Sequence, residues 1–202
     1  MSGIPVLVEV DGLDILIVGG GPLAARRAEK LLAAGARVRV VAVAVSAELE
    51  ALRGQPSLSI EQREYASDDI GDAALVLAAT NDRAVNALVA RDASRARRLI
   101  NRGDVPDEGT CTMMAAHRAG SLVIGVSAGG VPGAATRIRD AIATRFDGRY
   151  ARAIERLSAL RLAMLARGDR APWARAADVA LGEDFCEAVE QGTLDERMAG
   201  WR

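Results

Sequence analysis

The sequence predicts an α/β protein whose first half is a parallel sheet with helices, followed by a short antiparallel hairpin and a helical tail. Three observations predict this order. Apolar strand-like runs alternate with helical runs over residues 15–101, which is the pattern of a parallel sheet. Two short strand-like runs with one turn between them follow at residues 112–127. From residue 149 the chain is rich in Arg, Glu and Ala and helical in pattern.

Composition limits the partners of the chain. It has 202 residues, of which 50% are apolar and 3% aromatic, so the core must consist mainly of Ala, Val, Leu and Ile. This length suits one moderate domain, or one domain with smaller appendages. Scarce aromatic residues argue against a surface that stacks bases, and a formal net charge of −1 favours neither nucleic acid nor membrane. We therefore expect neither as a partner.

Periodicity and turn residues place the elements of the sheet region in order. They are a short strand Pro5–Val10, a turn Asp11-Gly12, a strand Ile15–Val18, a helix Leu23–Ala34 closed by Gly35, a strand Arg37–Val43, a short helix from a Ser46 cap to Leu52, a strand Leu58–Gln62, a polar loop with Ser67-Asp68-Asp69, a strand Ala73–Ala79, a helix Arg83–Ala96 capped by Thr80-Asn81-Asp82, and a strand Leu99–Asn101. We expect Leu23, Leu31 and Leu32 on the sheet side of the first helix. A strand, helix and strand within about 30 residues should form a right-handed parallel unit.

The pattern changes after Asp104. The expected elements there are a loop over residues 105–111, antiparallel strands Thr112–His117 and Leu122–Ser127, a helix Ala134–Arg145, and helices after Arg149 that Gly168, Pro172, Gly182 and Gly192 divide. The hairpin should lie outside the parallel sheet.

The stretch from Ile15 to Ala24 carries a dinucleotide-binding pattern. Its spacing Gly19-x-Gly21-x-x-Ala24 matches the fingerprint with Ala in the third place. Gly19 allows a tight turn, Gly21 leaves room for a pyrophosphate, and Ala24 lets the helix pack close to the sheet. The helix N-terminus, with Pro22 in its first turn, offers N–H groups and a positive dipole end to phosphates. The pattern therefore favours a nucleotide site over a purely structural glycine turn.

Loops at the carboxyl ends of parallel strands should meet in one crevice, where ligands of such sheets bind. The expected cofactor contacts are Gly19, Gly21, Pro22 and Leu23 on the pyrophosphate, Val43 and Ala44 at the adenosine ribose, and Thr80 and Asn81 facing the cofactor. The alternative for Thr80 and Asn81 is a plain helix cap. No Asp or Glu ends the second strand, so the usual acceptor for the ribose 2′-hydroxyl is absent. Arg39 is expected to point away, so no 2′-phosphate site is evident. This favours NAD over NADP.

Cysteine and histidine usage indicates no metal site. Cys111 and Cys186 lie far apart, so neither a disulfide framework nor a zinc cluster is implied. His117 is the only histidine, so one chain cannot build a site with several histidines. The sequence shows no basic N-terminal region before a long apolar run and no uncharged apolar stretch that spans a bilayer. We expect a soluble, cytoplasmic protein.

Motifs spread over about 145 residues together resemble a known family. They are Ile4-Pro5-Val6, Leu16-Ile17-Val18-Gly19-Gly20-Gly21, Ala24-Ala25-Arg26-Arg27-Ala28, Leu31-Leu32-Ala33-Ala34-Gly35-Ala36, Ala78-Ala79-Thr80-Asn81-Asp82, Val85-Asn86, Asn101, Asp104, and Val126-Ser127-Ala128-Gly129-Gly130. The chain is similar to the precorrin-2 dehydrogenase and sirohydrochlorin ferrochelatase family, the N-terminal module of sirohaem synthases.

The resemblance implies three parts and a reaction. Residues 1–111 would form an NAD-binding Rossmann domain, residues 112–148 a strand-plus-helix dimerisation element, and residues 149–202 a helical C-terminal domain. The chain would act as a homodimer and oxidise precorrin-2 to sirohydrochlorin with NAD⁺. In bifunctional members of the family the same cleft then inserts Fe²⁺.

The resemblance also suggests which residues act on the substrate. Asp104 matches the acid/base aspartate of the family, and a carboxylate near the nicotinamide is suited to accept the proton that oxidation removes. Its alternative is a turn aspartate before Val105-Pro106. The substrate carries eight carboxylates, so cations and backbone N–H groups should line its site. The expected substrate-binding residues are Asn101, Ser127, Gly129, Gly130 and Arg137, with Arg102, Arg118 and Arg139 as flanking cations; for any single Arg the alternative is a solvated surface.

Several positions depart from the family pattern, mostly on the substrate side. Asn101-Arg102-Gly103-Asp104 stands where Asn-Val-Val-Asp is common, which changes how rigidly Asp104 is held. Thr112-Met113-Met114-Ala115 replaces an apolar and aromatic segment, Pro132-Gly133 replaces Ser-Pro, and Pro22 replaces a frequent acidic residue.

These departures keep a second hypothesis open, a catalytically silent NAD- or tetrapyrrole-binding module that acts as a sensor or carrier. A short-chain oxidoreductase for another substrate is disfavoured, because the Tyr-x-x-x-Lys pair is absent and Lys30 is the only lysine.

Overall fold

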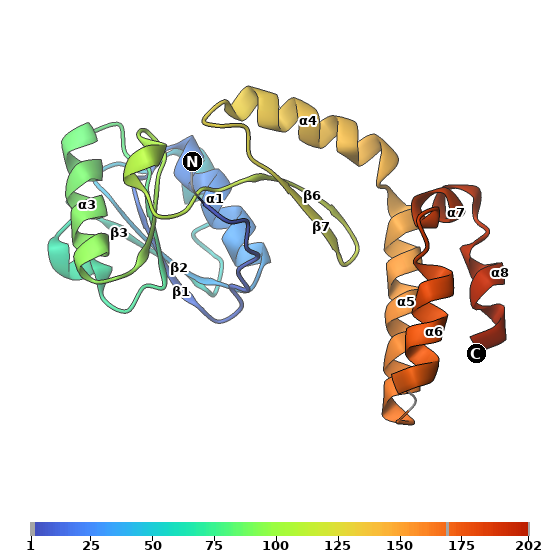
Figure 1. The fold of residues 1–202 in the computed structure, drawn as a ribbon. Helices are drawn as coiled ribbons and strands as arrows, with labels where there is room; N and C mark the ends of the chain where they lie inside the picture. Colours follow the sequence, from blue (N-terminus) through green and yellow to red (C-terminus); the bar gives the residue numbers. More distant parts are fainter. Residues whose placement is uncertain (1–2, 169, 202) are drawn as a thin grey trace. The chain divides into compact units, whose positions relative to one another are not determined.

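A computed structural model describes residues 3–168 and 170–201. The chain divides into two compact units, one ending at Met113 and one beginning at Met114 (Figure 1). The first unit contains the parallel sheet. The second contains the hairpin and the C-terminal helices.

The first unit is built on a five-stranded sheet in which all strand pairs are parallel. Its strands are β1 (Asp14–Val18), β2 (Arg37–Ala42), β3 (Leu58–Gln62), β4 (Leu75–Ala78) and β5 (Leu99–Arg102), in the spatial order β3-β2-β1-β4-β5. Val18 pairs with Val41 of β2 and with Ala78 of β4, so these three strands end at one level. The glycine-rich loop after β1 therefore lies between the loops that follow β2 and β4.

Helices cover both faces of this sheet (Figure 1). They are α1 (Pro22–Ala33), α2 (Ala47–Glu50) and α3 (Arg83–Arg95), with 3₁₀ turns at Ser67–Ile70 and Pro106–Glu108. One core cluster joins α1 and Leu49 of α2 to alternate residues of the central strands, such as Ile15 and Val38. The other joins α3 to the opposite face, including Leu16 and Val76. The alternation follows from the two-residue period of a strand.

The buried face of α1 consists of small residues. Ala24, Ala25, Ala28 and Leu31 are buried at helical spacing, which lets the helix lie close to the sheet. Leu23, predicted on this face, is instead 37% exposed. The prediction was wrong because Ala24 and Ala28 define the buried stripe, and Leu23 points away from its centre.

The polar loop predicted at Ser67-Asp68-Asp69 is a 3₁₀ turn with a buried acid. Asp69 is 7% exposed and accepts hydrogen bonds from Arg63 at 2.6 and 2.8 Å. These bonds lower the pKa of the Asp69 carboxyl to about 2, and Arg39 adds to the effect. Arg39 therefore points to Asp69, in agreement with the expectation that it does not serve a 2′-phosphate.

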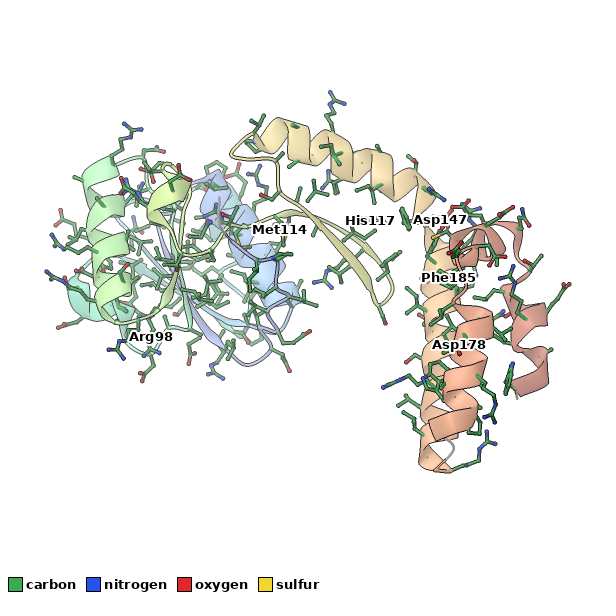
Figure 2. All side chains as sticks on the ribbon, in the orientation of Figure 1. Arg98, Met114, His117, Asp147, Asp178 and Phe185 are labelled. Carbon is green, nitrogen blue, oxygen red and sulfur yellow. The ribbon has the colours of Figure 1, made fainter. Side chains whose placement is uncertain are left out.

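The second unit begins with an antiparallel hairpin of β6 (Ala115–Ala119) and β7 (Leu122–Val126). A two-residue turn joins the strands, shorter than the predicted four-residue connection. Helix α4 (Pro132–Arg145) packs on the hairpin. His117 of β6 donates a hydrogen bond from Nε2 to the carbonyl oxygen of Phe146, 2.6 Å away, so this histidine joins strand to helix (Figure 2).

The rest of the second unit is helical: α5 (Gly148–Ala166), α6 (Arg170–Ala180), α7 (Phe185–Gln191) and α8 (Leu194–Met198). Its core surrounds Tyr150, which is 2% exposed and donates to Glu190 Oε1 at 2.8 Å. Five of the six aromatic residues of the chain belong to this unit, both tryptophans among them, and Tyr65 alone to the first.

Two further predictions of secondary structure were wrong. Residues 3–10 form no strand, and Ile4, Val6 and Leu7 are 82%, 62% and 62% exposed. A strand needs a neighbour, and this segment pairs with none of the five strands; both edges of β1, the strand that follows it, are taken by β2 and β4. Pro172 does not divide the tail either. It lies in the first turn of α6, where a missing N–H costs nothing.

The remaining elements lie within about three residues of their predicted bounds. No helix in the described ranges is both long and apolar enough to cross a bilayer.

Candidate active site

The first two glycines after β1 are required by packing within the protein. Gly19 has φ +122°, and a Cβ there would lie 2.4 Å from the carbonyl oxygen of Ala79. A Cβ at Gly20 would lie 2.1 Å from the carbonyl oxygen of Ala44. Neither overlap can be relieved by a side-chain rotation, because the obstacle is backbone. These two glycines let the loop after β1 pass between the loops that follow β2 and β4.

Gly21 has no such reason within the protein. Its φ of −79° and ψ of −179° are open to any residue, and a Cβ there would meet nothing within 4 Å. It is the N-cap of α1, with Pro22 as the first helical residue. The first-turn N–H groups of a helix need an outside partner and attract anions. The free space at Gly21 therefore fits a ligand phosphate.

The loop after β2 is tied to the glycine-rich loop. The N–H of Ser46 donates to the carbonyl oxygen of Gly20 at 2.8 Å. Val43, predicted to border a ribose, is 67% exposed, and Ala44 is exposed as well. Both lie at the carboxyl end of β2 and leave their side chains free for a ligand.

The loop after β4 is fixed by a buried side chain that the sequence analysis did not assign to the site. Asn86 of α3 is 1% exposed, and its Oδ1 accepts from the N–H and the hydroxyl of Thr80 at 3.2 and 2.8 Å. Its Nδ2 donates to the carbonyl oxygen of Thr80 at 3.0 Å. Asp82 caps α3 by accepting from the next backbone N–H groups. The hydroxyl of Thr80 is thus used internally, whereas Asn81 is exposed.

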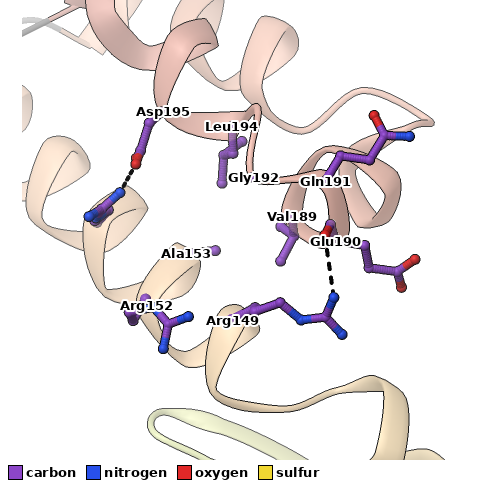
Figure 3. A pocket seen from close by; sticks show the side chains of 10 residues that line it. Arg149, Arg152, Ala153, Val189, Glu190, Gln191, Gly192, Leu194 and Asp195 are labelled. Atoms are coloured by element: carbon purple, nitrogen blue, oxygen red, sulfur yellow. Dashed lines mark hydrogen bonds and ion pairs between the residues drawn. The ribbon is translucent and has the colours of Figure 1, made fainter.

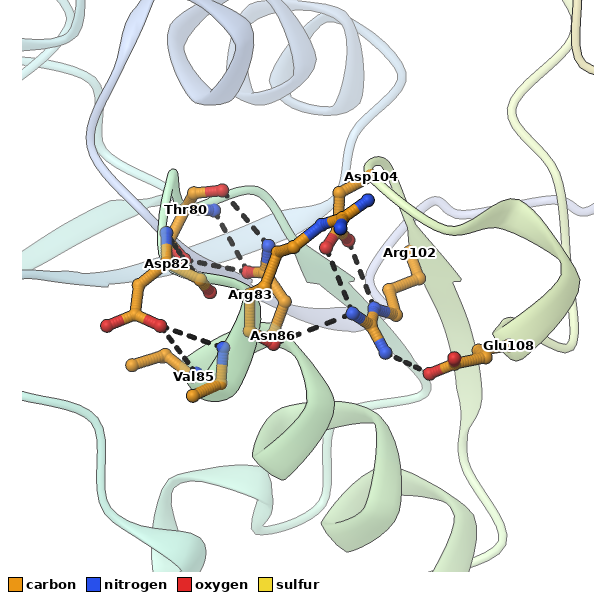
Figure 4. A network of polar contacts seen from close by, with 9 residues as sticks. Thr80, Asp82, Arg83, Val85, Asn86, Arg102, Asp104 and Glu108 are labelled. Atoms are coloured by element: carbon orange, nitrogen blue, oxygen red, sulfur yellow. Dashed lines mark hydrogen bonds and ion pairs between the residues drawn. The ribbon is translucent and has the colours of Figure 1, made fainter.

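Asp104 is held by an arginine two residues before it (Figure 4). Nε and Nη2 of Arg102 donate to the two carboxylate oxygens of Asp104 at 3.0 and 2.9 Å. The side chain of Arg102 is 4% exposed and that of Asp104 is 20% exposed. Arg102 also forms an ion pair with Glu108.

This pair sets the charge of Asp104. The hydrogen bonds of Arg102 lower its pKa to about 2, against the opposing effect of burial, and Asn86 contributes in the same direction. Asp104 is therefore a carboxylate at neutral pH, oriented by a two-point contact. A carboxylate so stabilised accepts a proton only weakly until the contact is loosened.

Asn101 is buried beneath the loop that carries Asp104. It is 4% exposed, and its Nδ2 donates to the carbonyl oxygen of Cys111 at 3.0 Å. This bond closes the segment between β5 and Cys111, as expected for a residue that braces the loop. Its Oδ1 is buried without a hydrogen-bond partner.

The other predicted substrate residues lie in the second unit. Ser127 and Arg137 are exposed, and Gly129 and Gly130 have φ of +57° and +86°, which favours glycine at both positions. Their part in substrate binding stays a prediction. Arg118 is exposed as well, and Arg139 pairs with Asp140.

A hollow of about 370 Å³ lies in the helical part of the second unit (Figure 3). Three arginines of α5 line it, Arg149, Arg152 and Arg156. Arg156 forms an ion pair with Asp195, and Arg149 donates to the carbonyl oxygen of Glu190. Two of its cations are thus satisfied within the protein, which makes this hollow a poorer candidate than the loops of the sheet.

Asn86 of the first unit was missed as a part of the site, and Arg102, expected as a cation flanking the substrate, is instead buried and holds Asp104. Asn86 lies four residues after the Asp82 cap, a spacing that turns its side chain back toward the preceding loop. Arg102 continues an apolar strand and lies two residues before Asp104, the first acid of the loop. Both signals were present in the sequence.

A parallel sheet with a glycine-rich turn into a closely packed helix, and with open space at the third glycine, is typical of a dinucleotide-binding α/β protein. The model of a family described as putative NAD(P)-binding matches residues 6–115. The chain belongs to this family.

Individual relatives agree with the resemblance seen in the motifs. The chain is 36% identical to a siroheme synthase of Ectopseudomonas mendocina over 151 residues, 74% of this chain and 32% of the relative. It is 35% identical to the siroheme synthase of Stutzerimonas stutzeri over 204 residues, 100% of this chain and 42% of the relative. The chain thus spans less than half the length of these curated relatives.

A solved structure shares the fold. SirC, a precorrin-2 dehydrogenase, superposes with a TM-score of 0.76 at 23% identity, over 98% of this chain and 100% of that one. The predicted fold class, a Rossmann-type sheet followed by a strand-plus-helix element and a helical region, is confirmed.

Proposed function

We propose that this chain oxidises precorrin-2 to sirohydrochlorin with NAD in sirohaem synthesis. The observation that carries the proposal is the pairing of two features at one edge of the sheet. The unfilled space at Gly21 fits a dinucleotide phosphate, and Asp104 holds a permanent negative charge on a loop of the same edge. Siroheme synthases that align over nearly the whole chain support the choice of substrate.

The residues present fit the cofactor. Gly19, Gly21, Pro22 and Leu23 would hold the diphosphate at the N-terminus of α1. Val43 and Ala44 would border the ribose, and Asn81 would face the nicotinamide half next to Thr80. NAD, when bound, supplies the acceptor for a hydride. Because no basic side chain ends β2 and Arg39 forms an ion pair with Asp69, we propose NAD rather than NADP.

Oxidation of the macrocycle also releases a proton, and Asp104 is the group we propose to accept it. Arg102 fixes the carboxylate in one orientation and keeps it ionised throughout the physiological range. The same arginine weakens it as a base, so proton transfer requires the contact between them to lengthen. The contact with Arg102 therefore orients Asp104 well but makes it a weaker base.

We propose that the second unit completes the enzyme. Residues 112–148 would form a dimerisation element and residues 149–202 a helical domain, in a cytoplasmic homodimer. Ser127, Gly129, Gly130 and Arg137 would contact the carboxylates of the tetrapyrrole, precorrin-2 or sirohydrochlorin.

The test is turnover by the purified chain. Precorrin-2 and NAD⁺ should yield sirohydrochlorin absorbance, and addition of Fe²⁺ then shows whether sirohaem follows. Asp104→Asn should lower kcat by about 10²-fold or more, because general acid–base catalysis contributes that much. Asp107→Asn, in an exposed acid of the same loop, is the control and should stay within about twofold. Equal rates for both variants would contradict the role of Asp104.

A second candidate function is a silent binding module for NAD or a tetrapyrrole. The low pKa of Asp104 favours it, since such a carboxylate is a weak base. It predicts saturable binding of NAD and tetrapyrrole with no product. Turnover by the wild-type chain excludes it.

A further inference from the structure

One arginine of the first unit has a charge that the protein does not satisfy. Arg27 lies in the second turn of α1, and its side chain is half-buried. Its Nη1 is fully buried and has no hydrogen-bond partner. Within residues 3–168 and 170–201, no carboxylate forms an ion pair with it. Burial lowers the pKa of the Arg27 guanidinium, and the neighbouring Arg26 adds to this effect.

The guanidinium lies beside the loop that carries the candidate acid. A Cβ built on Gly103 would be 3.5 Å from Nη2 of Arg27 and 3.6 Å from Cδ2 of Leu23. Gly103 immediately precedes Asp104. Arg27 therefore reaches the carboxyl end of β5 from the side of α1.

A second buried atom on this side of β5 also lacks a partner. Asn101 is 4% exposed, and its Oδ1 accepts no hydrogen bond, while its Nδ2 is used by the carbonyl oxygen of Cys111. Cys111 is close enough to Arg27 for the guanidinium to counteract the rise that burial causes in the pKa of the thiol. Arg27 and Asn101 are thus both near Cys111, and they leave one buried donor and one buried acceptor unused.

The other side of β5 contrasts with this cluster. There Arg102 is paired with Asp104 and Glu108. A desolvated cation without a partner destabilises a fold, and buried polar groups are normally paired. The partly buried, unpaired guanidinium of Arg27 lies next to a proposed ligand site, and its position is explained if the ligand supplies the anion that pairs with it.

We propose that Arg27 binds a carboxylate of the tetrapyrrole next to Asp104. The inference rests on the proposed function, since it takes the substrate to be polycarboxylate. A guanidinium binds a carboxylate at two points, which would fix the macrocycle relative to the candidate acid. The diphosphate is the less suitable partner. Gly21 lies six residues before Arg27, about 9 Å along the helix axis, whereas Gly103 is in contact range.

The test compares Arg27→Gln, Arg27→Lys and Arg26→Gln in the full chain. Arg26 is the matched control, an exposed arginine of the same helix. Sirohydrochlorin binding is followed by the absorbance of the tetrapyrrole, NADH binding by the fluorescence of the dinucleotide, and stability by thermal melting. Arg27→Gln should weaken sirohydrochlorin binding about tenfold or more, the usual effect of losing a charge-assisted hydrogen bond.

In the same variant NADH affinity should stay within about twofold. The melting temperature should hold or rise, because an unpaired desolvated charge is removed. Arg27→Lys should lose part of the tetrapyrrole affinity, since lysine keeps the charge but lacks the planar fork. Arg26→Gln should behave as wild type.

Three results would overturn the inference. Weaker NADH binding with unchanged sirohydrochlorin binding would assign Arg27 to the dinucleotide. A lower melting temperature with both affinities unchanged would make it a structural residue. An equal loss in Arg26→Gln would show a general effect of surface charge. If Arg27→Gln does not fold, Arg27→Lys decides, and full tetrapyrrole affinity in that variant overturns the inference.

The outcome is separable from that of the proposed function. A wild-type chain that binds sirohydrochlorin through Arg27 but does not oxidise precorrin-2 would end the proposed function and leave the inference standing. If Arg27→Gln oxidises precorrin-2 and binds sirohydrochlorin as well as the wild-type chain does, the inference about Arg27 is overturned and the proposed function stands. Absence of any sirohydrochlorin binding by the wild-type chain would overturn this inference.

Discussion

Alanine substitutions at Gly19 and Gly21 should separate the glycine that the fold needs from the glycine that the ligand needs. At Gly19 the methyl group would sit 2.4 Å from the carbonyl oxygen of Ala79, at a φ of +122°. Strained backbone of this kind costs on the order of 1–3 kcal/mol. Overpacking against fixed atoms adds about 1–3 kcal/mol more. Gly19→Ala should therefore lower the free energy of unfolding by about 3 kcal/mol or more.

Gly21→Ala should leave the fold nearly unchanged. Its φ of −79° suits alanine and its Cβ would meet nothing within 4 Å, so the loss is that of a poorer N-cap, about 1 kcal/mol at most. The new methyl group would, however, occupy the space proposed for a phosphate. NAD affinity should fall about tenfold or more, as expected when a charge-assisted hydrogen bond is lost.

Urea unfolding and NADH titration of both variants measure the two effects independently. The expected pattern is an unstable Gly19→Ala and a stable Gly21→Ala with weak dinucleotide binding. Wild-type NADH affinity in Gly21→Ala would refute the assignment of this space to a phosphate. A stability loss in Gly21→Ala as large as that in Gly19→Ala would refute the distinction between the two positions.

Two further predictions concern acids whose charge the fold stabilises. Asp69→Asn should lower the free energy of unfolding by about 2 kcal/mol at pH 7, because the folded pKa of Asp69 is about 2 and the ordinary pKa of an aspartate is 3.8. The difference in stability between wild type and Asp69→Asn should vanish as the pH falls through 2 and the wild-type carboxyl is protonated. The control is Asp72→Asn, at an exposed acid, which should change stability by less than about 0.5 kcal/mol at every pH. Equal losses of stability in the two variants, measured by urea unfolding, would contradict the role of burial. Arg102→Gln should raise the pKa of Asp104 and move the acid limb of kcat/KM upward by about one pH unit or more. Glu108→Gln keeps the contact between Arg102 and Asp104, so the acid limb of its kcat/KM profile should stay at the wild-type pH. An acid limb that does not move in Arg102→Gln would contradict the assignment of Asp104 as the group that titrates there.

The local elements of the sheet were predictable because their signals are local. Apolar periodicity bounded by turn residues and polar caps located β1, β3 and α3 to within a residue or so. The strand predicted at Pro5–Val10 failed for the opposite reason. Its pattern suits a strand, but a strand must also pair with the edge of a sheet, and no local pattern reports whether the segment reaches one.

The site was predictable in its backbone and less so in its side chains. The glycine spacing located the phosphate loop, because each position has a steric requirement. The partner of Asp104 is another matter. Whether Arg102 turns inward and pairs or lies in solvent depends on Glu108, six residues further along its own loop, and on Asn86, which α3 brings from elsewhere in the fold. Ion pairing across elements has no periodic signature in the sequence.

The uneven distribution of aromatic residues gives each unit its own spectroscopic signal. Both tryptophans, Trp173 and Trp201, belong to the second unit, and the sheet unit has Tyr65 as its one aromatic residue. Indole emission should follow the melting of the helical unit alone. Stabilisation of the sheet unit by dinucleotide should instead be visible in amide hydrogen exchange of β1 and β4, which gives a way to observe whether the two units unfold as one or in succession.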